Sequence, residues 1–233
     1  MIESILPTAV AAVDTFVDPP GATLHQEEEP LVSQAVHKRR AEFTTGRWCA
    51  RQAMARLGRP LIPILSGACG EPQWPAGLVG SITHCAGYRC AVVAETTQVT
   101  TVGIDAEPNE PLHHGILAAI SVPEEVPRIE ALRHDHPDVS WDRLLFSAKE
   151  SVYKAWFPLT ARWLDFQDAS LVINPVDGTF NARLRVTGPR VHGRKLSGFA
   201  GRWLVDQGLI VTAITIPEPA PAAAAPVEAP AQL

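Results

Sequence analysis

Apolar residues recur at helical spacing in two long stretches, residues 33–58 and residues 141–157, and each stretch predicts a helix. Ser33 can cap the first helix and Gly58 can end it. The first helix also carries six basic residues, and in the simplest interpretation they form a solvated basic face. They are Lys38, Arg39, Arg40, Arg47, Arg51 and Arg56.

Short apolar runs bounded by turn residues predict strands elsewhere. They lie at residues 80–83, 89–95 and 99–107 before the second helix, and at 171–173, 179–186, 198–205 and 209–216 after it. Residues 63–77 are rich in glycine and proline and predict a loop. Residues 111–138 hold several prolines and predict an irregular connection with some helix.

The order of a helix and then strands occurs twice, which indicates an α+β fold of two similar lobes. We expect an N-terminal lobe at residues 1–105 and a C-terminal lobe at residues 106–216. Residues 217–233 are almost entirely Pro, Ala and Glu. Such a segment buries too little apolar surface to offset the entropy of ordering it, so we expect a disordered tail.

The composition narrows the class of protein. The 233 residues are 46% hydrophobic and carry a net charge of -5, which gives no overall electrostatic reason to bind nucleic acid. No stretch is long and apolar enough to span a membrane, and the first residues lack the basic start of a signal peptide. The four cysteines form no C-x-x-C pair. We therefore expect a cytoplasmic protein with free thiols.

Two carboxylates lie two residues apart at the end of an apolar strand, in the segment Gly103-Ile104-Asp105-Ala106-Glu107. The two-residue period of a strand points both to the same face. Oxygen-only ligands suit a hard cation such as Mg2+. The alternative is that both side chains simply face solvent.

A second segment, Phe146-Ser147-Ala148-Lys149-Glu150-Ser151-Val152-Tyr153-Lys154, places Glu150 and Lys154 on one face of a helix. One face therefore presents an acid beside a proton donor. Two structural interpretations compete. Glu150 and Lys154 can form an ordinary surface ion pair, and Ser147 with Glu150 matches a capping box.

A third segment, Gly80-Ser81-Ile82-Thr83-His84, ends a predicted strand with a histidine that can contact phosphate. A lone histidine is more often a structural residue held by hydrogen bonds.

Taken together and in their order along the chain, the three segments resemble the 4'-phosphopantetheinyl transferases of the larger, surfactin-synthetase-activating type, especially their actinobacterial members. The segments Arg39-Arg40-Ala41-Glu42-Phe43 and Gly70-Glu71-Pro72 are also similar to that family. The resemblance runs from about Glu42 to about Ile216. It implies a pseudo-twofold pair of α+β lobes and a usually monomeric enzyme. The implied enzyme transfers phosphopantetheine from coenzyme A to a serine of an apo acyl or peptidyl carrier protein, and releases 3',5'-adenosine bisphosphate.

The resemblance also implies roles for single residues. Asp105, Glu107 and Glu150 would coordinate Mg2+, or Mn2+ in its place. Glu150 would take the proton of the carrier serine, and Lys154 would stabilise the leaving group. The implied coenzyme A contacts are Arg39 or its neighbour Arg40, Arg47, His84, Lys149 and Lys154.

Some expectations stay open at this point. Many relatives carry a basic residue in the loop that here reads Ser66-Gly67-Ala68-Cys69, so we expect weaker or different phosphate contacts there. Four apolar positions after the carboxylate strand are equally suited to carrier docking and to the core. They are Leu112, Ile116, Leu117 and Ile120. A metal-dependent phosphohydrolase of a small phosphate ester and a non-catalytic coenzyme A-binding module remain the alternative functions.

Overall fold

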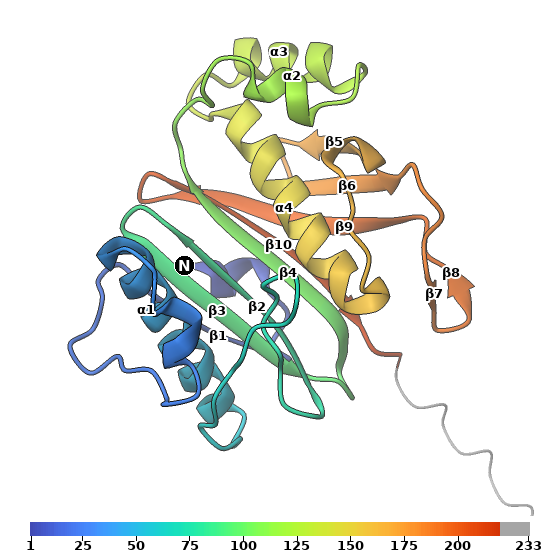
Figure 1. The fold of residues 1–233 in the computed structure, drawn as a ribbon. Helices are drawn as coiled ribbons and strands as arrows, with labels where there is room; N and C mark the ends of the chain where they lie inside the picture. The colour runs from blue at the N-terminus through green and yellow to red at the C-terminus, as the bar shows by residue number, and fades with distance from the viewer. Residues whose placement is uncertain (220–233) are drawn as a thin grey trace, which may run out of the picture.

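The computed structural model describes residues 1–219, and Figure 1 shows two antiparallel sheets, each with a long helix against one face. The smaller sheet has the strand order β1 (Val10–Thr15), β3 (Tyr88–Glu95) and β2 (Leu78–Cys85). The larger sheet has the order β4 (Val99–Pro108), β10 (Leu209–Pro217), β9 (Gly198–Asp206), β6 (Thr179–Leu184) and β5 (Ala169–Asn174).

Two helices of 20 residues each cover these sheets. They are α1 (His37–Arg56) on the small sheet and α4 (Trp141–Thr160) on the large one. The shorter helices are η1 (Ile2–Ile5), η2 (Glu29–Val32), α2 (Ile116–Ile120), α3 (Glu125–Asp135) and η3 (Phe166–Asp168). A small hairpin of β7 (Arg190–Val191) and β8 (Arg194–Lys195) joins β6 to β9. The predicted α+β fold of two lobes is confirmed.

Three apolar clusters hold these layers together. One lies between α1 and the small sheet, and one lies between α4 and the large sheet. The third joins the lobes, because the other face of β3 packs against β4 and β10 of the large sheet. Residues such as Val92, Ile104 and Val211 are fully buried there. The two lobes therefore share a core, and their relative position is set by packing.

The structure differs from the sequence prediction at the first helix. It begins at His37, and its N-cap residue Val36 makes no side-chain cap, so the predicted cap by Ser33 is wrong. Ser33 instead follows the end of η2, and its hydroxyl donates to the carbonyl of Pro30 within that helix. The predicted solvated basic face is also wrong for Arg47 and Arg51, which are 5% and 6% exposed.

The lobes meet at β4. β4 pairs with β10 from Val99 opposite Pro217 to Pro108 opposite Leu209, with one register shift between Ile216 and Pro217. The expected boundary at residue 105 falls inside this strand, whereas the turn between β3 and β4 separates the two sheets.

The prediction missed β1 and shortened or extended several other elements. β1 pairs with β3 along its whole length, from Val10 opposite Ala94 to Thr15 opposite Arg89. This strand lies in an apolar opening stretch that has Pro7 before it and Pro19-Pro20-Gly21 after it, so turn signals at both ends could have revealed it.

The far end of the chain is described only to residue 219, so most of the predicted disordered tail lies outside the described residues. Its first residues are held: β10 continues to Pro217, and the N–H of Glu218 donates to the carbonyl of Gln98 at 2.8 Å. In the described part of the chain, every helix is too short or too polar to cross a membrane.

Candidate active site

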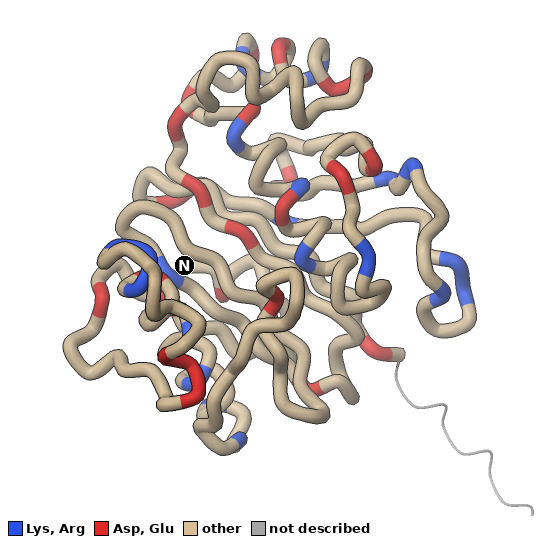
Figure 2. Tube along the Cα trace, viewed as in Figure 1, with Lys and Arg blue, Asp and Glu red and all other residues tan. Residues whose placement is uncertain are grey.

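The carboxylates of β4 lie where the two lobes meet, and Figure 2 shows acidic positions along this strand. Asp105 is 5% exposed, so it does not simply face solvent. Its Oδ1 accepts hydrogen bonds from the Thr83 hydroxyl at 3.1 Å and from the Lys154 ammonium at 2.7 Å. Its Oδ2 is buried and has no hydrogen-bond partner among residues 1–219. Glu107, on the same side of the strand, is half-buried and accepts from Arg143 at 2.9 Å.

A glycine of β4 allows α4 to lie close against this strand. A Cβ at Gly103 would lie 2.3 Å from the carbonyl oxygen of Ser151 and 2.6 Å from the N of Ala155, so only glycine lets α4 pack this closely on β4. The close packing places Lys154 within bonding distance of Asp105.

The structure excludes both structural interpretations of the helix segment. Ser147 and Glu150 lie inside α4, well after its N-cap Ser140, so they form no capping box. The Ser147 hydroxyl instead shares a hydrogen bond with Thr212 of β10. Lys154 pairs with Asp105 and not with Glu150.

Burial and mutual repulsion make this cluster of acids favour a cation. Burial, followed by the charge of Asp105, raises the pKa of Glu107, while Arg143 opposes the shift. Burial also raises the pKa of Glu150, with Asp105 adding to the shift and Lys154 opposing it. The charge of Asp105 therefore raises the pKa of both Glu107 and Glu150, and the ammonium of Lys154 lowers both.

No group of three or more His, Cys, Asp or Glu side chains in the described residues is already arranged around a metal position. Lys154 and Arg143 hold the carboxylates instead. The residues still fit a hard divalent ion. Asp105 keeps a buried oxygen without a partner, and two further carboxylates whose raised pKa values reflect its charge lie nearby.

A cavity of about 420 Å³ opens beside Glu150 and Lys154, and we call it the apolar-walled cavity. Aromatic and small side chains form most of its wall. They include Trp74, Tyr153, Phe157, Pro158 and Ala161, together with Cys69, Glu71 and Pro72. The charged lining residues of this cavity are Glu71, Glu150 and Lys154, and the apolar remainder of its wall is suited to an uncharged chain.

A second cavity of about 360 Å³ lies next to it, and we call it the basic cavity. It is lined by Arg39, Arg47 and His84, and it shares residues 70, 72 and 82 with the apolar-walled cavity. Arg47 is fixed by hydrogen bonds to the Ile64 carbonyl at 2.7 Å and to the Ser66 hydroxyl at 3.0 Å.

The electrostatics of the basic cavity suit an anion. Burial lowers the pKa of Arg47 to about 10, so the guanidinium stays charged at neutral pH. Burial also lowers the pKa of His84; Glu42 opposes this shift, and Arg39 adds to it. An uncharged His84 ring can accept a hydrogen bond from Arg39, because Nη1 of Arg39 lies 2.6 Å from Nε2 of His84.

Two of the residues considered from the sequence do not face either cavity. Arg40 forms an ion pair with Glu29, so of the two adjacent arginines only Arg39 lines the basic cavity. Lys149 is 3% exposed, and its ammonium donates to three carbonyl oxygens and to Glu125. These contacts give Lys149 a structural role.

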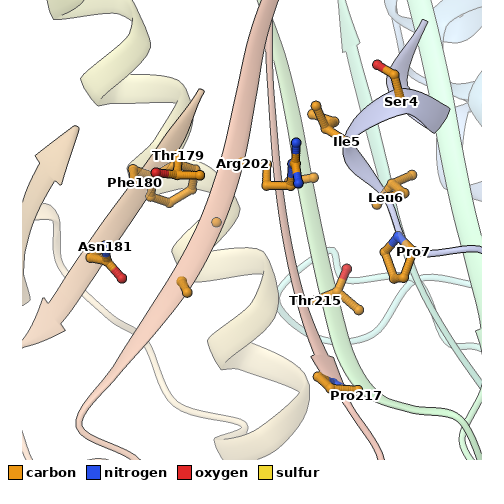
Figure 3. Close-up of a pocket in the computed structure, with 13 residues that line it drawn as sticks. Ser4, Ile5, Leu6, Pro7, Thr179, Phe180, Asn181, Arg202, Thr215 and Pro217 are labelled. Atoms are coloured by element: carbon orange, nitrogen blue, oxygen red, sulfur yellow. The ribbon is translucent and has the colours of Figure 1, made fainter. Parts of the chain in front are cut away.

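A larger cavity of about 560 Å³ lies elsewhere, between η1 and the strands β6, β9 and β10 (Figure 3). In the described part of the chain, Arg202 is its only charged lining residue, and no carboxylate or histidine lines it. Its size alone does not make it a reaction site.

Sequence reasoning assigned no role to Arg143, Thr83 or Glu42. Arg143 lies seven residues before Glu150, which is two helical turns, so helical spacing could have placed it on the same face. Thr83 and the buried Glu42, whose Oε2 is 3.6 Å from His84 Nδ1, contact residues far away in the sequence. No local pattern reveals those contacts.

Comparisons with known proteins show the family of this chain. Residues 27–94 match the model of the 4'-phosphopantetheinyl transferase N-terminal domain, and residues 101–203 match the model of the 4'-phosphopantetheinyl transferase superfamily. The 4'-phosphopantetheinyl transferase Svp of Streptomyces mobaraensis is 52% identical over 94% of this chain and 91% of its own length. The chain belongs to the 4'-phosphopantetheinyl transferase family.

Two further relatives have the same name and similar coverage. The 4'-phosphopantetheinyl transferase PptT of Mycobacterium tuberculosis is 48% identical over 93% of this chain and 98% of its own length. The 4'-phosphopantetheinyl transferase Npt of Nocardia iowensis is 45% identical over 92% of this chain and 99% of its own length. This 4'-phosphopantetheinyl transferase is therefore an enzyme that moves the phosphopantetheine of coenzyme A to carrier proteins.

Proposed function

We propose that transfer takes place where Asp105, Glu150 and Lys154 meet, with Mg2+ bound and coenzyme A lying across the two cavities. The observation that carries the proposal is the 2.7 Å contact between Lys154 and the buried Asp105, at the edge of a cavity that Glu150 also lines. Burying charged groups costs free energy of folding. Clusters of such groups beside a cavity are therefore typical of functional sites.

The two cavities match the two halves of coenzyme A. The basic cavity, with Arg39, Arg47 and His84, would take the phosphorylated nucleotide, because a guanidinium binds phosphate oxygens in pairs. The apolar-walled cavity would take the uncharged pantetheine arm, against Trp74 and Tyr153. The pyrophosphate would then lie between the cavities, beside Lys154.

Asp105, Glu107 and Glu150 would hold Mg2+, or Mn2+ in its place, with the free Oδ2 of Asp105 as one donor. When bound, this ion neutralises charge on the pyrophosphate and orients it. A cation at Oδ2 would repel the Lys154 ammonium on Oδ1, and that ammonium could then move to a phosphate oxygen.

The chain's own residues then account for the proton and the leaving group. Glu150, which lines the apolar-walled cavity, would take the proton of the carrier serine hydroxyl. The serine oxygen bonds to the phosphorus that carries pantetheine, and the bond from that phosphorus to the bridging oxygen breaks. Lys154 would stabilise the charge on the departing 3',5'-adenosine bisphosphate.

The partners would be apo acyl or peptidyl carrier proteins, and the protein would act as a monomer in the cytoplasm. Its four cysteines form no disulfide among the described residues, which suits a reducing compartment. Of the apolar positions considered for carrier docking, Ile116 is 38% exposed, Leu112 and Leu117 are half-buried, and Ile120 belongs to the core.

The test is to incubate the protein with coenzyme A, Mg2+ and a panel of apo carrier proteins, and to weigh the carriers by mass spectrometry. We expect one phosphopantetheine per carrier, and a loss of about 100-fold or more in rate for Glu150→Gln with coenzyme A binding retained. Near-normal turnover by Glu150→Gln would remove Glu150 from the mechanism. Free phosphopantetheine formed without a carrier would favour the phosphohydrolase instead.

A further inference from the structure

The strands β2 and β4 lie side by side but belong to different sheets, and no backbone pairing joins them among residues 1–219. Two hydroxyl groups of β2 take the place of a backbone ladder. The N–H of Ile104 donates to the Ser81 hydroxyl, and the N–H of Ala106 donates to the Thr83 hydroxyl, each at 3.1 Å. Both hydroxyls are buried, and both satisfy a backbone donor that would otherwise be buried without a partner.

The two hydroxyls differ in one respect. Thr83 also donates its hydrogen to Oδ1 of Asp105 at 3.1 Å, whereas Ser81 has no contact with a carboxylate among the described residues. A hydroxyl has a single hydrogen to donate. The N–H of Ala106 occupies a lone pair of Thr83, so its hydrogen is left to point at Asp105.

This contact determines which oxygen of Asp105 is free. Oδ1 is taken by Thr83 and Lys154, and Oδ2 remains buried without a partner. When Lys154 leaves for a phosphate oxygen, Thr83 is the remaining side chain that holds the carboxylate. We propose that Thr83 is a positioning residue that holds Asp105 with Oδ2 turned to the divalent ion. The inference rests on the proposed function, in which Asp105 is a metal ligand.

The test measures Mn2+ binding to the protein in the presence of coenzyme A, by electron paramagnetic resonance of the free ion, independently of turnover. Thr83→Val keeps the shape of the side chain and removes the hydroxyl. We expect it to weaken Mn2+ binding about tenfold, as expected when a group that orients a metal ligand is lost. Thr83→Ser keeps the hydroxyl and should restore binding to within about twofold of wild type.

Ser81→Ala is the matched control, because it removes the same kind of backbone contact without touching Asp105. We expect its Mn2+ affinity to stay within about twofold of wild type. Equal losses in Ser81→Ala and Thr83→Val would show that both hydroxyls only hold the strands together, and would overturn the inference. Should Thr83→Val fail to fold, Thr83→Ala takes its place with the same expectation.

Asp105→Ala separates this inference from the proposed function. Loss of Mn2+ binding in Asp105→Ala with unchanged binding in Thr83→Val overturns the role of Thr83 alone. Wild-type binding in Asp105→Ala overturns the metal site itself, and the role of Thr83 with it.

Discussion

Lys149 and Lys154 lie on the same helix and are both bound to carboxylates, yet we propose opposite roles for them. The ammonium of Lys149 is 2.8 Å from Glu125 Oε2 and donates to three carbonyl oxygens at 2.8–3.0 Å. Both side chains of this pair are at most 2% exposed. Glu125 is held in turn by the N–H groups of Val122 and Leu171. The pair therefore joins α3, α4 and β5.

Replacing Lys149 by methionine keeps most of the volume and removes the charge. It leaves Glu125 buried without its cation, which typically costs about 3–5 kcal/mol. Domains of this kind are stable by about 5–15 kcal/mol, so the loss is a large fraction of the total. The same change at Lys154 should cost less, about 1–3 kcal/mol. The Lys154 side chain is 25% exposed, and its buried partner Asp105 keeps the hydrogen bond from the Thr83 hydroxyl.

The assay combines urea unfolding with transfer kinetics at a temperature where both variants are folded. Lys149→Met should unfold at a much lower urea concentration with an unchanged slope, and its kcat per folded molecule should stay within about twofold of wild type. Lys154→Met should unfold at a urea concentration closer to that of wild type, but its kcat should fall by about 100-fold.

One result would refute this reasoning. If Lys149→Met kept the wild-type unfolding midpoint but lost turnover or coenzyme A affinity, Lys149 would contact the substrate, as the family resemblance implied.

Three further predictions follow from the site. Arg47→Ala should raise the KM for coenzyme A about tenfold or more, whereas Arg40→Ala, the matched control, should stay within about twofold; equal effects would contradict the placement of the nucleotide. N-ethylmaleimide at neutral pH should label the exposed Cys69 alone, because burial raises the pKa of Cys49 and Cys85 to about 12 and raises that of Cys90 as well. Coenzyme A should slow this labelling, because Cys69 lines the apolar-walled cavity, and peptide mass mapping checks both expectations. Gly103→Ala should push α4 away from β4 and lower both the unfolding midpoint and the transfer rate; wild-type values for both would refute the close approach.

The sequence by itself determined the local geometry of the site. The two-residue period of a strand placed Asp105 and Glu107 on one side of β4, and helical spacing placed Glu150 and Lys154 on one side of α4. The same segments identified the family. Which side chains share a face depends only on the period of the strand or helix, and a short stretch of sequence is enough to show that period.

The tertiary structure decided which of these side chains meet. The contacts of Asp105 with Thr83 and Lys154 span 22 and 49 residues, and the contact of Arg39 with His84 spans 45. Whether an arginine of α1 faces the cavity or a neighbouring acid, and whether a lysine of α4 faces the substrate or the core, depends on the packing of helix on sheet. That packing involves residues from the whole chain, so no single stretch could reveal it.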